Sequence, residues 1–434
     1  MPRFIVLVAL ALALSVSGGI GLATTRDSEP TPQAATSLAP SAPGQDLTGT
    51  IEALQDTLRR LPQDHSAWAT LALAYVEQGR VTGVPSYYEK ATDAARESLR
   101  VQPDDNFEGL AASAAIAAAR HDFSGALELA DQSLAINPLG LSALAIRVDA
   151  LTELGRYDDQ LKALRVADRR QPSTAVAARY SYAYELRGDL PRAASILESA
   201  ASTAVRADKA YLLTLLADIE RRQGRLAQAG RALDIAEEAA PDYLPAVVSR
   251  ARWQVAQGDL ARAVTTWTRV VSAQPLPEYL TELGELYLHL GRPAEAQRQF
   301  DVVEATITLL ESGGVDTDLE AAVHEADHGD PERARELAAS EWGRRHSVHV
   351  ADAYAWALHR VGRDGRALDL ARRATALGTP DARFWIHRGS IEAALGMDRA
   401  ARVHLRRGLD GDPGLSLWQR DQAQRVLETL GGAR

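Results

Sequence analysis

The sequence predicts an all-α fold, a solenoid of about ten similar helix pairs with a capping helix at each end. The first observation is a glycine that recurs every 33–38 residues between two stretches rich in Ala and Leu. The second is a small residue that stands, with few exceptions, seven positions before each glycine and five positions after it. Self-similarity at such a period is the mark of a repeat architecture. The recurring glycines are Gly155, Gly188, Gly224, Gly258, Gly291, Gly329, Gly362 and Gly396.

Residues 1–23 are the first predicted segment. Arg3 precedes the uncharged run "FIVLVALALALSVSGGIGLATT", and a positive end followed by an apolar run is typical of an export signal. Gly21 and Ala23 offer small residues for a cleavage site, while the run also approaches the ~20 residues that span a bilayer. We therefore expect a signal peptide or a signal anchor. Either one places the body outside the cytoplasm, secreted or anchored to the membrane by this N-terminal segment.

Residues 24–45 form a Pro/Ser/Thr/Ala-rich stretch with almost no large apolar side chain. Such a segment cannot bury enough surface to offset chain entropy, so we expect a disordered linker. The solenoid is predicted to follow over residues 46–430. It should begin with a helix from Leu47 to Leu61 and end with a capping helix from Ser416 to Leu430, because terminal caps cover the open faces of a stacked array.

Each repeat is predicted to be a helix, a short turn, a second helix and a stop. Glycine after the first helix supplies a left-handed turn, and an Asp or Pro just after it begins the next helix. The first unit inserts seven residues after Gly79, and its Tyr88 is expected to be a core side chain. The seventh unit has a long second helix from Pro293 to about Glu311, and residues 311–315 are the expected joint of the solenoid.

The repeat resembles the tetratricopeptide repeat (TPR), with its 34-residue period. The stretch from Leu280 to Val303 carries the resemblance best, through Leu283, Gly284, Tyr287, Gly291, Ala296 and Phe300. The first unit adds Trp68, Leu71, Ala72 and Tyr75. The resemblance covers about residues 65–413 and implies a right-handed superhelical solenoid of an exported bacterial type. It also implies that the first helix of each pair lines a concave groove.

Composition excludes several classes of function. The net charge of −10 argues against nucleic acid as a partner. The absence of Cys excludes disulfides, thiolate metal sites and cysteine nucleophiles. The sequence contains no Walker phosphate loop, nucleophile elbow or dinucleotide fingerprint, so neither an enzyme nor a cofactor is expected.

The string "HEADH" at residues 324–328 matches the H-E-x-x-H pattern of zinc peptidases. His324 and His328 share a helix face, with Glu325 between them, so this pair is a weak metal candidate. Gly329 and Pro331 end the helix directly afterwards, and Asp327 puts a charge inside the motif. A third ligand would have to come from Glu341, His346 or His349. We expect no metal, and two histidines at the negative end of a helix dipole instead.

The resemblance places the partner-binding positions ten, six, three and two residues before each turn glycine. Mixed charges with a few aromatic side chains suit a groove that holds a peptide or a helix. The prediction is therefore a non-enzymatic scaffold that binds a protein or peptide in its concave groove. The alternatives are a zinc-dependent hydrolase that uses the HEADH string and a binder of envelope glycan or lipid headgroups. The predicted groove residues are Tyr182, Glu185, Asp218, Arg221, Arg222, Arg252, Glu285, His289, Asp352, Trp356, His359 and Arg360.

Overall fold

A computed structural model of the protein describes residues 47–432, which fold into 22 α-helices without a β-strand. The all-α prediction is therefore confirmed for this part of the chain. The expected signal segment at residues 1–23 and the linker at 24–45 lie outside the described residues, so both stay predictions. Within 47–432, none of the helices has both the length and the apolar character needed to cross a bilayer.

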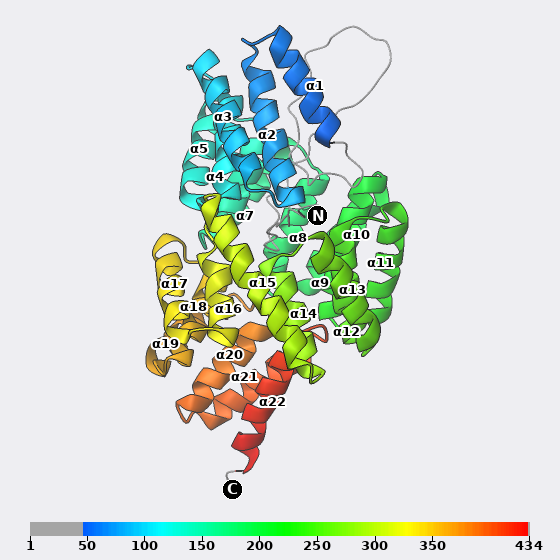
Figure 1. Ribbon diagram of the computed structural model, residues 1–434, viewed down its shortest axis with the longest axis vertical. Helices are drawn as coiled ribbons and strands as arrows, with labels where there is room; N and C mark the ends of the chain where they lie inside the picture. Colours follow the sequence, from blue (N-terminus) through cyan, green and yellow to red (C-terminus); the bar gives the residue numbers. More distant parts are fainter. Residues whose placement is uncertain (1–46, 433–434) are drawn as a thin grey trace, which may run out of the picture. The chain divides into compact units, whose positions relative to one another are not determined.

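The helices form ten pairs, from α2–α3 to α20–α21, with α1 before them and α22 after them (Figure 1). They fall into two compact units, the first made of the residues up to Arg179 with Leu309–Asp316 and the second of Tyr180–Thr308 with the residues from Thr317 onward. Helix α8 therefore begins in the first unit and ends in the second, whereas α15 begins in the second unit and ends in the first. The expected joint near residues 311–315 stays a prediction.

The first unit contains α1 (Leu47–Arg60), α2 (His65–Thr82), α3 (Ser86–Val101), α4 (Phe107–Ala119), α5 (Phe123–Ile136), α6 (Leu141–Glu153), α7 (Tyr157–Arg170) and the beginning of α8 (Thr174–Glu185). The second unit contains α9 (Leu190–Thr203), α10 (Arg206–Arg222), α11 (Leu226–Ala239), α12 (Leu244–Ala256), α13 (Leu260–Ala273), α14 (Pro277–His289), most of α15 (Pro293–Ser312), α16 (Asp318–His328), α17 (Pro331–Arg344), α18 (Val348–Arg360), α19 (Asp364–Ala374), α20 (Ala382–Ala394), α21 (Asp398–Gly411) and α22 (Leu417–Gly432).

The turns within the pairs follow the predicted pattern. Seven of the eight predicted turn glycines have φ between +70° and +76°, the left-handed region that a Cβ disfavours. At Gly224, for example, the N–H donates to the carbonyl of Arg221 at 2.8 Å, which satisfies one of the last carbonyls of α10. Gly329 is the exception, because its φ is −129°, so the prediction of a left-handed turn there is wrong.

The first pair differs from the prediction at its turn. Helix α2 continues through Gly79 to Thr82, and Gly83, with φ of +69°, ends it. The insertion therefore lengthens α2 by a few residues and moves the turn to residues 83–85. A Cβ on Gly79 would lie 2.9 Å from Cε1 of Tyr88, so this glycine makes room for the tyrosine ring. Tyr88 is only 8% exposed, which confirms it as a core side chain.

Small residues bring the paired helices close together, as predicted. Ala322 on α16 and Ala334 on α17 have no exposed surface. A Cβ on Gly284 would overlap the ring of Phe300, and one on Gly389 would lie 2.7 Å from Cγ of Leu405. The backbones of these pairs are therefore nearer to each other than alanine at those two positions would allow without a shift.

Helix α22 caps the last pair, as predicted for the C-terminal helix. Its Ala423 and Leu430, with Leu415 just before it, are buried in one apolar cluster with Ile386 of α20 and Leu405 of α21. Burial of these side chains removes from water the face that a further repeat would otherwise cover.

The second unit also brings residues far apart in sequence into contact. The Tyr182 hydroxyl lies 3.1 Å from Nε2 of His349, 167 positions later. The Thr379 hydroxyl donates to the carbonyl of Leu186 at 2.7 Å across 193 positions. The beginning of this unit therefore lies beside α18 and the segment before α20.

Candidate partner-binding face

The predicted groove residues of the second unit lie on one side of the first helix of each pair, here called the inner face. On α10, Asp218 and Arg222 are four residues apart and Arg221 lies beside them, so their side chains share this side. Ala217 is 2% exposed and packs in the helical core, as its predicted role as a small packing residue requires.

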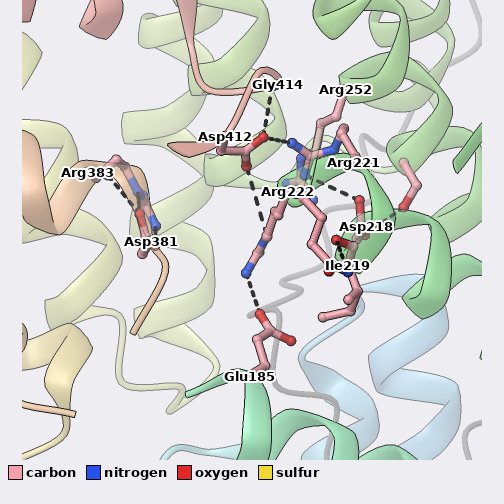
Figure 2. Close-up of polar contacts among 12 residues, drawn as sticks. Glu185, Asp218, Ile219, Arg221, Arg222, Arg252, Asp381, Arg383, Asp412 and Gly414 are labelled. Carbon is pink, nitrogen blue, oxygen red and sulfur yellow. Dashed lines mark hydrogen bonds and ion pairs between the residues drawn. The ribbon is translucent and has the colours of Figure 1, made fainter. Parts of the chain in front are cut away.

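Arg221 is the most enclosed member of a charged cluster on the inner face (Figure 2). Its side chain is 3% exposed and contacts Asp412, which comes from the loop after α21. It also lies 3.3 Å from Oδ1 of Asp218, whose other oxygen accepts from the Ser249 hydroxyl at 2.8 Å. Such a buried guanidinium requires carboxylate partners because an isolated buried charge is costly.

Asp412 is held as a carboxylate by its surroundings. Burial alone would raise its pKa, but the Arg221 and Arg222 guanidiniums and the Gly414 N–H, which donates to Oδ1 at 2.8 Å, lower the pKa below its usual value. The charged form of this side chain is therefore favoured in the folded protein.

Arg222 joins one further acidic residue, Glu185, to the same cluster. It contacts Glu185 of α8, and its Nε lies 3.9 Å from Oδ2 of Asp412. Burial opposes a charged guanidinium, yet the Glu185 and Asp412 carboxylates raise the pKa of Arg222. Burial raises the pKa of Glu185, and Arg222 only partly offsets this effect.

Helices α12 and α14 carry the next charged pair. Arg252 donates from Nε to Oε1 of Glu282 at 3.1 Å. Glu278, one turn before Glu282, has its pKa raised to about 8 by its burial, with Arg252 lowering it and Glu282 raising it. On α20, Arg383 pairs with Asp381 at 3.0 Å. The expected mixture of charges is present, although Glu282, Asp381 and Arg383 were not among the predicted residues.

Glu285 and His289 of α14 both face the C-terminal helix. Glu285 is 2% exposed and accepts from Nε2 of His328 at 3.0 Å. The His328 ring stacks on Phe300, with ring centres 4.3 Å apart, and lies 4.8 Å from the Trp418 ring of α22. His289 meets Oδ2 of Asp421, also on α22, at 2.7 Å.

Trp356 of α18 is held by contacts within the unit. Its indole N–H donates to Oδ1 of Asp327 at 2.7 Å, and its ring stacks on His387 with centres 4.1 Å apart. His387 in turn donates from Nδ1 to Oδ2 of Asp352 at 2.9 Å. Burial opposes the charged imidazole, but the Asp352 carboxylate outweighs it and raises the pKa of His387.

The remaining predicted residues are Tyr182, His359 and Arg360. Tyr182 contacts His349, as described above, and the pKa of His349 is lowered to about 4 by burial. His359 meets Oδ1 of Asp364 at 2.5 Å near the end of α18. Arg360, the last residue of α18, is exposed to solvent.

The HEADH string has structural partners. His328 is bound by Glu285, and Oε2 of Glu325 accepts from the N–H of Asp330 at 2.7 Å, at the beginning of α17. The Glu325 carboxylate occupies the space that a Cβ at Gly329 would need, so glycine leaves room for this contact. His324 is 4% exposed and lies against the Phe300 ring.

The three side chains proposed as a third metal ligand have other partners. Glu341 pairs with Arg344 and Arg345 on α17 and just after it. His346 packs edge-on against Trp342, with ring centres 4.4 Å apart. His349 contacts Tyr182. None of these three side chains therefore joins the two histidines of the string, and the carboxylate that lies beside the string, Glu285, contacts His328.

Sequence reasoning missed Asp412, Trp418 and Asp421, which contact the inner face from the loop after α21 and from α22. Asp412 lies at the end of the stretch that resembles the repeat, about residues 65–413, and outside every predicted groove position. Trp418 and Asp421 lie on the predicted capping helix. Its capping role predicts only that its apolar side packs on the last helix pair. No local pattern shows that the other side of this helix faces α14 and α16.

Comparisons with known proteins give one family match and several similar structures. Residues 249–305 match the tetratricopeptide repeat family. No curated protein matches the chain. A tetratricopeptide repeat protein from Parabacteroides merdae is similar in structure at 21% identity, with a TM-score of 0.34, over 60% of this chain and 100% of its own. A thermophilic TPR protein from Thermus thermophilus shows 22% identity and a TM-score of 0.36, over 42% and 96% of the two chains. The human IFIT1 dimer with m7Gppp-AAAA shows 14% identity and a TM-score of 0.48, over 84% and 86%.

The repeated helix pair and the charged inner face define a helical repeat protein, a class of fold that serves as a protein-interaction scaffold and is typically not enzymatic. The turn glycines and the small packing residues agree with the family match, so the chain contains tetratricopeptide repeats at residues 249–305 and helix pairs of the same pattern on both sides of them.

Proposed function

We propose that the protein is a non-enzymatic scaffold outside the cytoplasm, and that the inner face of its second unit forms a groove for a protein or peptide partner. The observation that supports this best is the concentration of charged side chains on the inner face, from Glu185 through Arg222 to Arg252. Arg is a common hot-spot residue of protein interfaces.

The proposed location depends on residues 1–23. A positive end and an apolar run indicate export, with the body either released or held at the membrane by this segment. Mass spectrometry of the protein from cell fractions tests this. Peptides from residues 1–23 in the membrane fraction support an anchor, a new N-terminus near Thr24 supports cleavage, and an intact cytoplasmic chain contradicts the proposal.

The other functions considered receive less support. A zinc hydrolase needs free ligands, whereas His328 is bound to Glu285 and Glu325 to the beginning of α17. A glycan or lipid binder needs an accessible aromatic surface, whereas Trp356 is stacked on His387 and Tyr182 contacts His349. The net charge of −10 also disfavours nucleic acid.

Site-specific photocrosslinking in cells tests the proposed groove. A photoreactive amino acid replaces Arg360, which is exposed at the end of α18, and in a matched variant it replaces Arg298, which is exposed on α15. We expect the Arg360 variant to capture a discrete protein and the Arg298 variant to capture none. Equal capture by both variants, or capture by the Arg298 variant alone, would contradict the assignment to the inner face.

A further inference from the structure

The inner face of the second unit is occupied by a short segment of the same chain. Residues 412–421, here called the C-terminal segment, reach three first helices in turn. Asp412 contacts Arg221 of α10, Trp418 lies against His328 of α16, and Asp421 meets His289 of α14. Figure 2 shows the Asp412 end of this arrangement, with the carboxylate directed at Arg221 and Arg222.

The segment and the face are complementary in chemistry. Carboxylates at both ends of the segment meet cationic or protonatable groups, and the tryptophan between them lies on an imidazole that is itself stacked on Phe300. Gln419 adds a weak contact, with its Nε2 3.5 Å from Oε1 of Glu285. Charge-assisted pairs at separated positions with an aromatic contact between them are what a groove-bound peptide would supply.

Helix α22 is attached on two sides, to α14 of the inner face and to the last helix pair. Leu415, Ala423 and Leu430 pack on the last helix pair, so this side has its own attachment. The His289–Asp421 pair is partly open to water, with side chains 28% and 44% exposed, and an ion pair of that kind contributes at most about 1 kcal/mol. Release of the C-terminal segment from the inner face also breaks the enclosed Arg221–Asp412 pair, whose side chains are 3% and 15% exposed, so the segment occupies the face in most molecules.

From these contacts we infer that the C-terminal segment is a built-in competitor, and that the partner offers a segment in which two carboxylates flank an aromatic side chain. This inference rests on the proposed function and names the partner class for the same face. When the internal segment occupies the face for most of the time, only a small fraction of the molecules can bind the partner. The apparent Kd for the partner is then the intrinsic Kd divided by that fraction. The internal segment also has the advantage of a high effective concentration, of the order of mM for short tethers.

A labelled peptide with the sequence of residues 410–424 tests the inference by fluorescence anisotropy. It is titrated with the wild-type chain and with the Asp412→Asn/Trp418→Ala/Asp421→Asn variant, in which the internal segment has lost its contacting side chains. We expect this variant to bind the peptide at least about tenfold more tightly than wild type. Asp410→Asn, at an exposed neighbouring position, is the matched control and should behave like wild type.

Two further arms make the result specific. A peptide that carries the same three substitutions should lose its binding to the triple variant. If the substituted peptide binds as tightly as the unmodified peptide, the peptide is replacing α22 on the last helix pair, and the inference is wrong. Adding Arg222→Gln and His289→Gln to the triple variant should weaken binding of the unmodified peptide at least about tenfold, because both side chains are partly exposed and touch the segment.

The outcome also separates this inference from the proposed function. No peptide binding by a folded triple variant, together with partner capture by the Arg360 crosslinker, would overturn the internal competitor and leave the scaffold function standing. Peptide binding without any captured partner would support the competitor and count against the scaffold function.

Discussion

Arg221 on α10 is joined to Asp412, 191 residues later in the chain. The arginine was predicted to face a partner, and its carboxylate neighbour is part of the protein itself. Because Arg221 is 3% exposed and Asp412 15% exposed, water screens this pair little, and its removal should be visible in the stability of the second unit.

Asp412→Asn should lower the free energy of unfolding by about 3 kcal/mol, because the buried Arg221 guanidinium then keeps only one carboxylate partner, Asp218. Urea unfolding followed by circular dichroism measures the change. Arg372→Gln is the matched control, because it removes an exposed pair with Asp369 whose side chains are 52% and 77% exposed. The control should change stability by less than about 1 kcal/mol. Equal effects of the two variants would contradict the burial argument.

Acid should destabilise the second unit through His324. Its pKa is lowered from 6.5 to about 4 by burial and by the neighbouring His328. Above pH 6.5 the imidazole is neutral in both states, so this group adds no pH dependence. Between pH 6.5 and 4 this imidazole binds more protons in the unfolded chain than in the folded protein. The free energy of unfolding therefore decreases as the pH is lowered, by up to about 3 kcal/mol from this group.

His324→Leu isolates this contribution to the pH dependence. Nδ1 of His324 has no hydrogen-bond partner among the described residues, so an apolar side chain should leave stability at pH 7.5 within about 1.5 kcal/mol of wild type. The loss of stability between pH 6.5 and 4.5 should become shallower. His346→Gln, at an exposed position, should leave the wild-type slope unchanged. Unfolding curves at both pH values measure this, and an unaltered slope in His324→Leu would rule out His324 as the cause.

Two glycines in the second unit should respond in opposite directions to alanine. Gly389→Ala places a Cβ 2.7 Å from Cγ of Leu405 and 2.9 Å from its backbone N, so about 1–3 kcal/mol of stability should be lost. Gly343→Ala, in the last turn of α17, meets nothing within 4 Å and should gain up to about 1 kcal/mol from helix propensity. Thermal melting of both variants measures the changes, and a stable Gly389→Ala protein would show that α20 and α21 are less closely packed.

Zinc should neither copurify with the protein in stoichiometric amount nor raise its Tm. His328 and Glu325 are engaged by Glu285 and by the N–H of Asp330. Glu325→Ala should instead cost about 1 kcal/mol, because it removes a hydrogen bond at the beginning of α17. Elemental analysis and melting with added zinc are the measurements. One bound zinc per chain that disappears in His328→Gln would overturn this account.

Local pattern predicted the helix pairs because each repeat is specified by its own turn and its own small residues. Ala322 and Gly224 could be assigned from spacing alone, since their neighbours lie within one pair. The inner-face positions followed from the same register, as Arg221 and Glu285 illustrate. The left-handed turn predicted at Gly329 was wrong. There the Glu325 side chain accepts a hydrogen bond from the N–H of Asp330, a contact that the spacing of the repeats does not predict.

Contacts across the second unit could not be predicted in the same way. The approach of Asp412 to Arg221 depends on the total rotation that accumulates over several successive helix pairs. Small changes in packing at each pair alter this total rotation, and no local sequence pattern predicts it. Trp356 shows the same limit, because its stacking on His387 joins two different pairs.

The most direct test of the occupied inner face is a distance measurement between α14 and α22. The chain has no cysteine, so Leu290→Cys and Gln422→Cys provide two unique sites for spin labels. Both positions are exposed, and each lies next to a member of the His289–Asp421 pair. A second label pair, Arg399→Cys with Gln422→Cys, reports on the attachment of α22 to the last helix pair.

Pulsed electron paramagnetic resonance should give one short, narrow distance between positions 290 and 422 in the free protein. Saturation with the peptide of residues 410–424 should lengthen and broaden that distance while the 399–422 distance stays constant. A broad 290–422 distribution in the free protein, or a narrow one that persists unchanged at peptide saturation, would contradict the account.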